Sequence, residues 1–130
     1  MRVAIPALLL AVAAATPAHA TGGMLCTPVS GRGPVVAFGF GHTIAPHVLS
    51  ASIEDGPLTL RTGGLIETAT LRSLVVGQSW IDRQGVKLDL VDPNVERFEG
   101  QLRATFRRDG IAVGTFARNG RTYRVRCEEA

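Results

Sequence analysis

The chain has 130 residues, of which 45% are hydrophobic and 19% are charged, and its formal net charge is +3. This length is typical of one domain. Glycine follows no three-residue period and the apolar residues are scattered along the chain, which excludes collagen-like, coiled-coil and highly charged disordered proteins. The sequence therefore predicts a single globular domain.

Residues 1–20 have the pattern of a secretory signal peptide. Arg2 supplies one positive charge, residues 3–15 form an uncharged apolar run, and small residues at Ala18 and Ala20 precede a cleavage site. The apolar run is too short to cross a hydrocarbon core of about 30 Å. We expect cleavage after Ala20, export to the periplasm or the cell exterior, and a single mature β domain over residues 21–130 without a transmembrane segment.

The chain has two cysteines, Cys26 and Cys127, near the two ends of the mature domain. In an exported protein an even cysteine count predicts a disulfide, and two cysteines allow only one pairing. A redox or metal-binding pair would need a C-x-x-C spacing or histidine neighbours, which are absent. Lipid attachment at Cys26 is disfavoured because the bulky Leu25 precedes it. We therefore expect a bridge between the first and last strand regions.

Alternation of apolar and polar residues recurs along the mature chain, with turn signals about every eight to twelve residues. No segment keeps a helical period over about twelve residues. The sequence therefore predicts an all-β fold, a small antiparallel sandwich or barrel of about eight or nine strands closed by one disulfide. The first six expected strands lie near residues 36–40, 49–53, 58–60, 65–71, 74–80 and 86–90.

Two local features interrupt this pattern. Trp80 alternates with Leu74 and Val76, so we expect it in the core at a strand end. Gln78 on that face would then be either a hydrogen-bonded buried amide or a sign that the face opens to a cavity. Asp92 followed by proline is typical of a helix start, and we expect a single helical turn near residues 93–97 that leads into a long strand.

The turns between the last three strands predict their register. Asn119-Gly120 favours a type I′ turn, because both residues tolerate positive φ, and this turn pairs Phe116 with Tyr123. At the preceding turn, a two-residue loop would place Arg103 opposite Phe116, whereas a three-residue loop with a left-handed Gly110 places Leu102 there. Burial favours the three-residue loop. The predicted inner face comprises Leu102, Ala104, Phe106, Ala112, Gly114, Phe116, Tyr123, Val125 and Cys127.

The same register predicts an outer face that carries four arginines: Arg103, Arg107, Arg124 and Arg126. Residues 97–126 hold eight arginines against two acids, whereas residues 21–96 have a net charge of −2. Because the guanidinium fork matches carboxylate and phosphate groups, we expect this face to bind an anionic envelope polymer, a lipid headgroup or an acidic protein. Alternatively, the arginines only solvate an exposed sheet face. Nucleic acid is not expected, because no aromatic residues are interleaved with the arginines.

The sequence shows no motif that indicates catalysis, a cofactor or a metal, and we predict a non-catalytic protein. His42 and His47 offer two metal ligands without a clear third. Asp82, Asp89 and Asp92 are spread over two turns and a strand. A small hydrolase would need a cleft that joins Asp82, Asp92 or His42.

In outline, this disulfide-closed β domain resembles the small exported inhibitors of c-type lysozyme, which are compact β-barrels with a disulfide. The resemblance covers architecture only, since that family's Ser-Gly-x-x-Tyr type of motif has no counterpart here. A basic face would also be repelled by the basic surface of such a lysozyme. The resemblance implies an alternative function, inhibition of an exported hydrolase through a loop such as Asp82–Gly85 or His42–His47.

Overall fold

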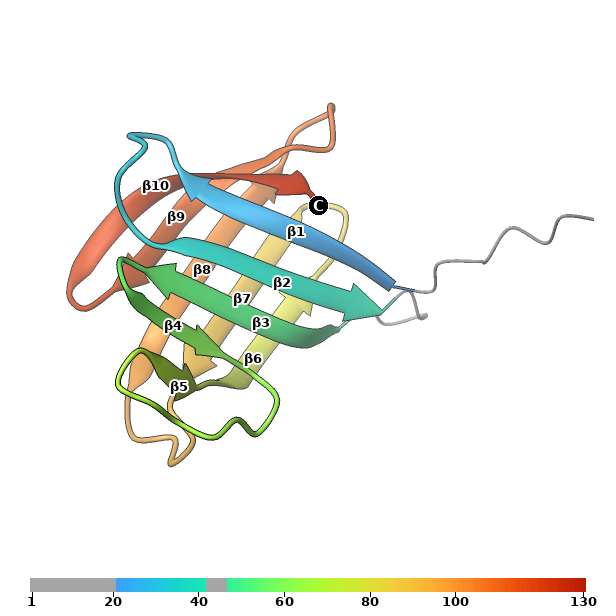
Figure 1. Cartoon of the computed structure of the whole chain (residues 1–130). Coiled ribbons are helices and arrows are strands. Elements are labelled where there is room, and N and C mark those ends of the chain that lie inside the picture. Colours follow the sequence, from blue (N-terminus) through green and yellow to red (C-terminus); the bar gives the residue numbers. More distant parts are fainter. Residues whose placement is uncertain (1–20, 42–46) are drawn as a thin grey trace, which may run out of the picture.

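The computed structural model describes residues 21–41 and 47–130, and these residues form an all-β fold without a helix. The strands join into one sheet in the order β5-β4-β3-β2-β1-β10-β9-β8-β7-β6. This sheet curls on itself, so that β1–β3 cross in front of β7–β9 (Figure 1). The strands are β1 (Thr21–Pro28), β2 (Val35–Gly41), β3 (Val48–Asp55), β4 (Leu58–Arg61), β5 (Leu71–Ser73), β6 (Val75–Ile81), β7 (Gly85–Val91), β8 (Phe98–Phe106), β9 (Ala112–Arg118) and β10 (Arg121–Glu129).

The predicted fold class is confirmed, with two differences of detail. The described residues form ten strands rather than eight or nine, and β5 pairs with β4 in parallel, whereas the other pairings are antiparallel. The edge strand β6 and the residue before it approach β3 and β4, which nearly closes the sheet into a barrel. The backbone N–H of Val48 on β3 donates to Ser79 Oγ on β6 at 3.4 Å, and the N–H of Leu74 donates to the carbonyl oxygen of Arg61 at 3.0 Å.

The core fills the space inside this curled sheet. Because successive residues of a strand point to opposite faces, only the inward-pointing side chains of each strand can reach this core. The largest fully buried side chains belong to strands from both halves of the sheet: Phe116, Ile53, Leu60, Leu88, Leu90 and Leu102. The outward side chains of β7–β10 do not belong to this core.

The predicted register of the last three strands is confirmed. Phe116 lies opposite Tyr123 on β10 and opposite Leu102 on β8. Asn119 and Gly120 both have positive φ, as a type I′ turn requires, and Gly110 has a φ of 83° in the three-residue loop. Arg103 on β8 and Arg124 and Arg126 on β10 consequently point away from the core.

The predicted disulfide is also confirmed: Cys26 on β1 and Cys127 on β10 are bonded and lie directly opposite each other. A disulfide suggests a non-cytoplasmic setting. Within the described residues no helix is long and apolar enough to cross a membrane. The predicted signal peptide, residues 1–20, lies outside the described residues.

The expected helical turn near residues 93–97 is wrong. Asp92 Oδ1 accepts hydrogen bonds from the backbone N–H groups of Glu96 and Arg97, both at 2.8 Å, and Val95 takes a φ of 56°. The carboxylate thus satisfies backbone donors that a helix would otherwise satisfy. The segment is a tight loop that leads into β8, the predicted long strand. The expected strand over residues 65–71 is also wrong except for Leu71, which begins β5.

The expected core position of Trp80 is wrong as well. The pairing of β6 with β7 shifts register between Val76 and Gln78, where Gly77 is an extra residue. Such a bulge moves every later side chain to the other face of the strand. Trp80 therefore lies on the outer face, 63% exposed, and Gln78 is exposed beside it.

A buried ion-pair cluster joins the start of β8 to the end of β9. Arg118 Nη1 donates to Glu99 Oε2 at 3.0 Å, and Arg118 Nε donates to Asp55 Oδ2 at 2.9 Å. Arg97 and Arg72 also donate to the Glu99 carboxylate, at 2.8 and 3.1 Å. Burial of Glu99 acts to raise the pKa of its carboxyl group, but the hydrogen bonds from Arg97 and Arg118 outweigh that effect and the pKa lies below its ordinary value.

Candidate binding face

Five residues form one row across the outer face of β6–β10. In successive strand pairings, each residue lies directly opposite the next: Trp80, Lys87, Arg103, Thr115 and Arg124. We call this set the cross-strand row. Neighbouring strands are about 4.8 Å apart, so the row extends over about 19 Å. It places one aromatic ring, three cations and one hydroxyl group side by side.

The four predicted binding arginines all lie on the outer face and are exposed. Two of them form an ion pair with an acidic residue two positions later in the sequence. Arg107 Nη2 lies 2.6 Å from Asp109 Oδ2, and Arg126 Nε lies 2.8 Å from Glu128 Oε1. Exposed pairs of this kind contribute only about 0–1 kcal/mol, so an external anion can compete for both arginines.

Arg103 is the most firmly positioned of the four. Its Nη2 lies 2.8 Å from Oδ1 of the buried Asp89, and its Nη1 donates to the carbonyl oxygen of Leu102 at 2.8 Å. Gln101 Nε2 also donates to Asp89, at 3.3 Å. A guanidinium group has five N–H donors. Arg103 therefore keeps donors for a ligand while its orientation is fixed.

The other two cations of the row, Lys87 and Arg124, have fewer interactions than Arg103. Neither side chain makes a hydrogen bond or an ion pair with the residues that the structure describes. Lys87 lies directly opposite Arg103. Like charges at directly opposite positions destabilise a sheet, and a bound anion would relieve that repulsion.

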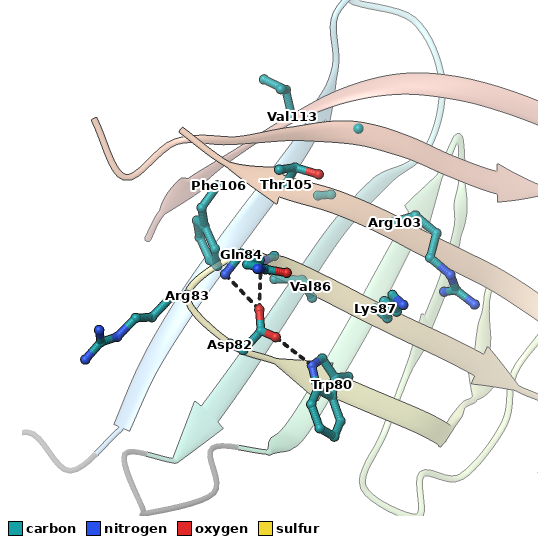
Figure 2. A pocket seen from close by; sticks show the side chains of 13 residues that line it. Trp80, Asp82, Arg83, Gln84, Val86, Lys87, Arg103, Thr105, Phe106 and Val113 are labelled. Atoms are coloured by element: carbon teal, nitrogen blue, oxygen red, sulfur yellow. Dashed lines mark hydrogen bonds between the residues drawn. The ribbon is translucent and has the colours of Figure 1, made fainter. Parts of the chain in front are cut away.

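The indole ring of Trp80 is held in place by Asp82. The indole Nε1–H donates to Asp82 Oδ2 at 2.9 Å, and Asp82 Oδ1 accepts from the backbone N–H groups of Gln84 and Gly85 at 2.8 and 3.0 Å (Figure 2). The hydrogen bond from Trp80, then those from Gln84 and Gly85, lower the pKa of Asp82, and the charge of Lys87 adds to this. Asp82 thus remains an anion that orients Trp80.

The outer face is hollowed around this row. A hollow of about 610 Å³ lies between the 82–85 turn and strands β7–β9, and a second of about 340 Å³ lies beside it. Trp80, Lys87 and Arg103 line both hollows, and Figure 2 shows them in the larger one. A third hollow, of about 360 Å³, continues past Gln78 and Asp89 to the exposed Phe98. Neighbouring hollows share lining residues, and we call the three hollows together the outer groove.

The residues considered for hydrolysis or metal binding are not brought together. Asp82 and Asp92 lie at opposite ends of β7, and each carboxylate accepts hydrogen bonds from its own turn. His47 is exposed just before β3, and His42 lies outside the described residues. Residues 21–41 and 47–130 contain no group of three or more His, Cys, Asp or Glu side chains that could hold a metal ion.

Comparisons with models of protein families, with curated proteins and with solved structures find no match to this chain. The function is therefore argued from the geometry of the outer face. Sequence reasoning found the arginines of this face but missed Trp80. Gly77 within an otherwise alternating strand was the available signal, because an isolated glycine in a strand often marks a bulge.

Proposed function

We propose that this protein is an exported, non-catalytic binding module that holds an anionic ligand on the outer face of β7–β10. The observation that carries the proposal is the cross-strand row, in which Lys87, Arg103 and Arg124 occupy one line over four neighbouring strands. Several cations in one line fit a ligand with repeated negative charges better than a single small anion.

The distribution of acids supports this proposal. Asp89 is buried and engaged by Arg103 and Gln101, so it orients a cation rather than presenting a negative charge to solvent. Asp109 and Glu128 lie beside Arg107 and Arg126 in pairs that cost little to open. A ligand with carboxylate, sulfate or phosphate groups would thus meet the three cations of the row. The acid beside the Trp80 end of the row, Asp82, accepts hydrogen bonds from the indole N–H and from two backbone N–H groups.

Export is part of the proposal. The pattern of residues 1–20 supports it, and so does the disulfide between Cys26 and Cys127, since disulfides persist in oxidising compartments. An exported basic face would meet the anionic polymers and lipid headgroups of a cell envelope.

The test is binding to immobilised dextran sulfate at low and physiological salt. Replacing Arg103 and Arg124 by glutamine should weaken binding at least about tenfold, because a hydrogen bond to a charged group contributes about 1.5–3 kcal/mol. The matched control removes the same charge elsewhere, with Arg32→Gln and Arg61→Gln, and should change binding much less. Equal retention of the two double variants, or weak binding by the unchanged protein, would refute the proposal.

Inhibition of an exported hydrolase is a second candidate, and one observation favours it. The Asp82–Gly85 turn is already ordered by Asp82 and by a backbone hydrogen bond from Asp82 to Gly85 at 3.1 Å, with Arg83 exposed at its tip. Rigid loops of this kind bind with little loss of entropy. If the protein inhibits a c-type lysozyme, Arg83→Ala should abolish inhibition while Arg124→Gln leaves it unchanged.

A further inference from the structure

We propose that the anionic ligand is an acidic polysaccharide, with one sugar ring stacked on Trp80 and its acidic groups bound by Lys87 and Arg103. This inference rests on the proposed function and names the ligand class for the same face. Three features of the outer groove carry it: the exposed indole ring, the cations next to it, and the length of the groove.

The exposed indole ring of Trp80 has no evident role in the packing of the fold. Its side chain is 63% exposed, so it contributes little to the core. Its only polar atom already donates to Asp82, which leaves the apolar faces of the ring to a ligand. The face of an aromatic ring carries partial negative charge, and the carbon-bound hydrogens of a sugar ring carry partial positive charge. A sugar ring therefore fits the fixed indole face.

Lys87 and Arg103 lie within reach of the acidic groups of a sugar chain whose ring is stacked on Trp80. Side chains at directly opposite positions on neighbouring strands have Cβ atoms about 4.5–5.5 Å apart. Lys87 is thus the immediate neighbour of Trp80, and Arg103 is the next residue of the row. A carboxylate or sulfate group on a ring stacked over Trp80 reaches Lys87, and the acidic group of a neighbouring unit reaches Arg103.

The groove runs along β7, across the direction of the cross-strand row, and meets the row at Trp80, Lys87 and Arg103. β7 has seven residues, which at a rise of about 3.4 Å per residue gives about 24 Å. Five of them line the groove: Gly85, Val86, Lys87, Asp89 and Val91. The three hollows follow one another along this strand. The first and second share Trp80, Lys87 and Arg103 in their lining, and the second and third share Gln78 and Asp89. Uncharged polar side chains, among them Gln78, Gln84 and Thr105, line the groove and can bond to sugar hydroxyl groups.

The chain contains one tryptophan, so tryptophan fluorescence, excited selectively over that of Tyr123, reports on this groove alone. Three probes separate the contributions: oligogalacturonate has rings and charge, polyglutamate has charge without sugar rings, and a malto-oligosaccharide has rings without charge. We expect oligogalacturonate to change the emission of Trp80 and to bind at least tenfold more tightly than either of the other probes.

The variant that tests the inference is Trp80→Ala, with binding measured by calorimetry. It should weaken oligogalacturonate binding at least fivefold and leave polyglutamate binding unchanged, whereas Trp80→Phe should recover part of the loss. Leu49→Ala, which removes another exposed apolar side chain on β3, is the matched control and should bind as the unchanged protein does. Equal melting temperatures establish that the variants are folded.

The outcomes distinguish the two proposals. If oligogalacturonate and polyglutamate bind equally and Trp80→Ala changes neither, the sugar inference is refuted and the anion-binding function stands. If neither polyanion binds, the proposed function fails and the inference fails with it. If the malto-oligosaccharide binds as tightly as oligogalacturonate, the assignment of an acidic ligand is wrong.

Discussion

The carboxylate of Glu99 and the guanidinium group of Arg118 meet at 3.0 Å inside the protein, where their side chains are 4% and 3% exposed. Arg118 also bonds to Asp55 at the end of β3, so this pair ties β8 and β9 to the opposite half of the sheet. Removing one member of a buried pair leaves the other charge buried without compensation, which is strongly destabilising.

We therefore expect Glu99→Gln to lower the free energy of unfolding by about 3 kcal/mol or more. Chemical denaturation at neutral pH measures this change. Glu54→Gln, which alters an exposed carboxylate on β3, is the control and should change stability by less than about 0.5 kcal/mol. Similar losses in both variants would show that the buried cluster does not hold the barrel end together.

Stability should also depend on pH through the same carboxyl group. The pKa of Glu99 is lower in the folded protein than its ordinary value of 4.5, because the hydrogen bonds from Arg97 and Arg118 outweigh the effect of burial. A depressed pKa contributes stability that is fully present above the ordinary value and is lost as the pH falls through the folded value. Thermal melts from pH 7 to pH 2 should show a decline below about pH 4.5, and this decline should be smaller in Glu99→Gln.

The disulfide between Cys26 and Cys127 closes a loop with a sequence separation of 101. In the chain-entropy model, a loop of this size stabilises the folded state by up to about 4.7 kcal/mol. The double variant Cys26→Ala/Cys127→Ala should lose a large part of that stability in urea denaturation. Reducing agent should destabilise the unchanged protein and leave the double variant unaffected. Destabilisation of both by the reductant would contradict this account of the bond.

Gly114 on β9 has no room for a side chain. A Cβ atom there would overlap the carbonyl oxygen of Arg103 and lie 2.6 Å from Ala104 Cα, both in the backbone of β8. We expect Gly114→Ala to destabilise the protein by about 1–3 kcal/mol. Gly23→Ala on β1, whose Cβ would lie at an ordinary 3.5 Å from the carbonyl oxygen of Phe38, is the matched control and should have little effect on the melting temperature.

The surface position of Trp80 can be tested without any ligand. Its emission should be that of a solvent-exposed indole and should be quenched efficiently by acrylamide. Unfolding should shift the emission maximum only slightly. A short-wavelength emission protected from acrylamide would instead place Trp80 in the core, as the alternation of its strand alone indicates.

The turns explain why the last three strands could be predicted from sequence. Asn119, Gly120 and Gly110 adopt positive φ, which few other residues accept, and these positions fix the register on which the arginine face depends. Burial of Leu102 and Phe116 then selects the inner face. The turn residues and the burial pattern indicate the same register at this end of the chain, so the outward direction of Arg103 and Arg124 could be predicted.

The candidate groove could not be predicted in the same way. One extra residue at Gly77 reverses the faces of β6, and alternation counted from Leu74 therefore places Trp80 on the wrong side. The contact between Arg118 and Asp55 depends on the curvature of the whole sheet, which brings the end of β3 next to the end of β9. Neither feature can be predicted from the spacing of residues within one strand or turn.

Mapping of backbone amide chemical shifts during titration with oligogalacturonate tests most directly where the ligand binds. We expect the largest shifts on the cross-strand row and its neighbours on β6–β10, and no shifts on the outer face of β1–β3. Shifts concentrated on β1–β3, or spread evenly over the surface, would contradict this prediction.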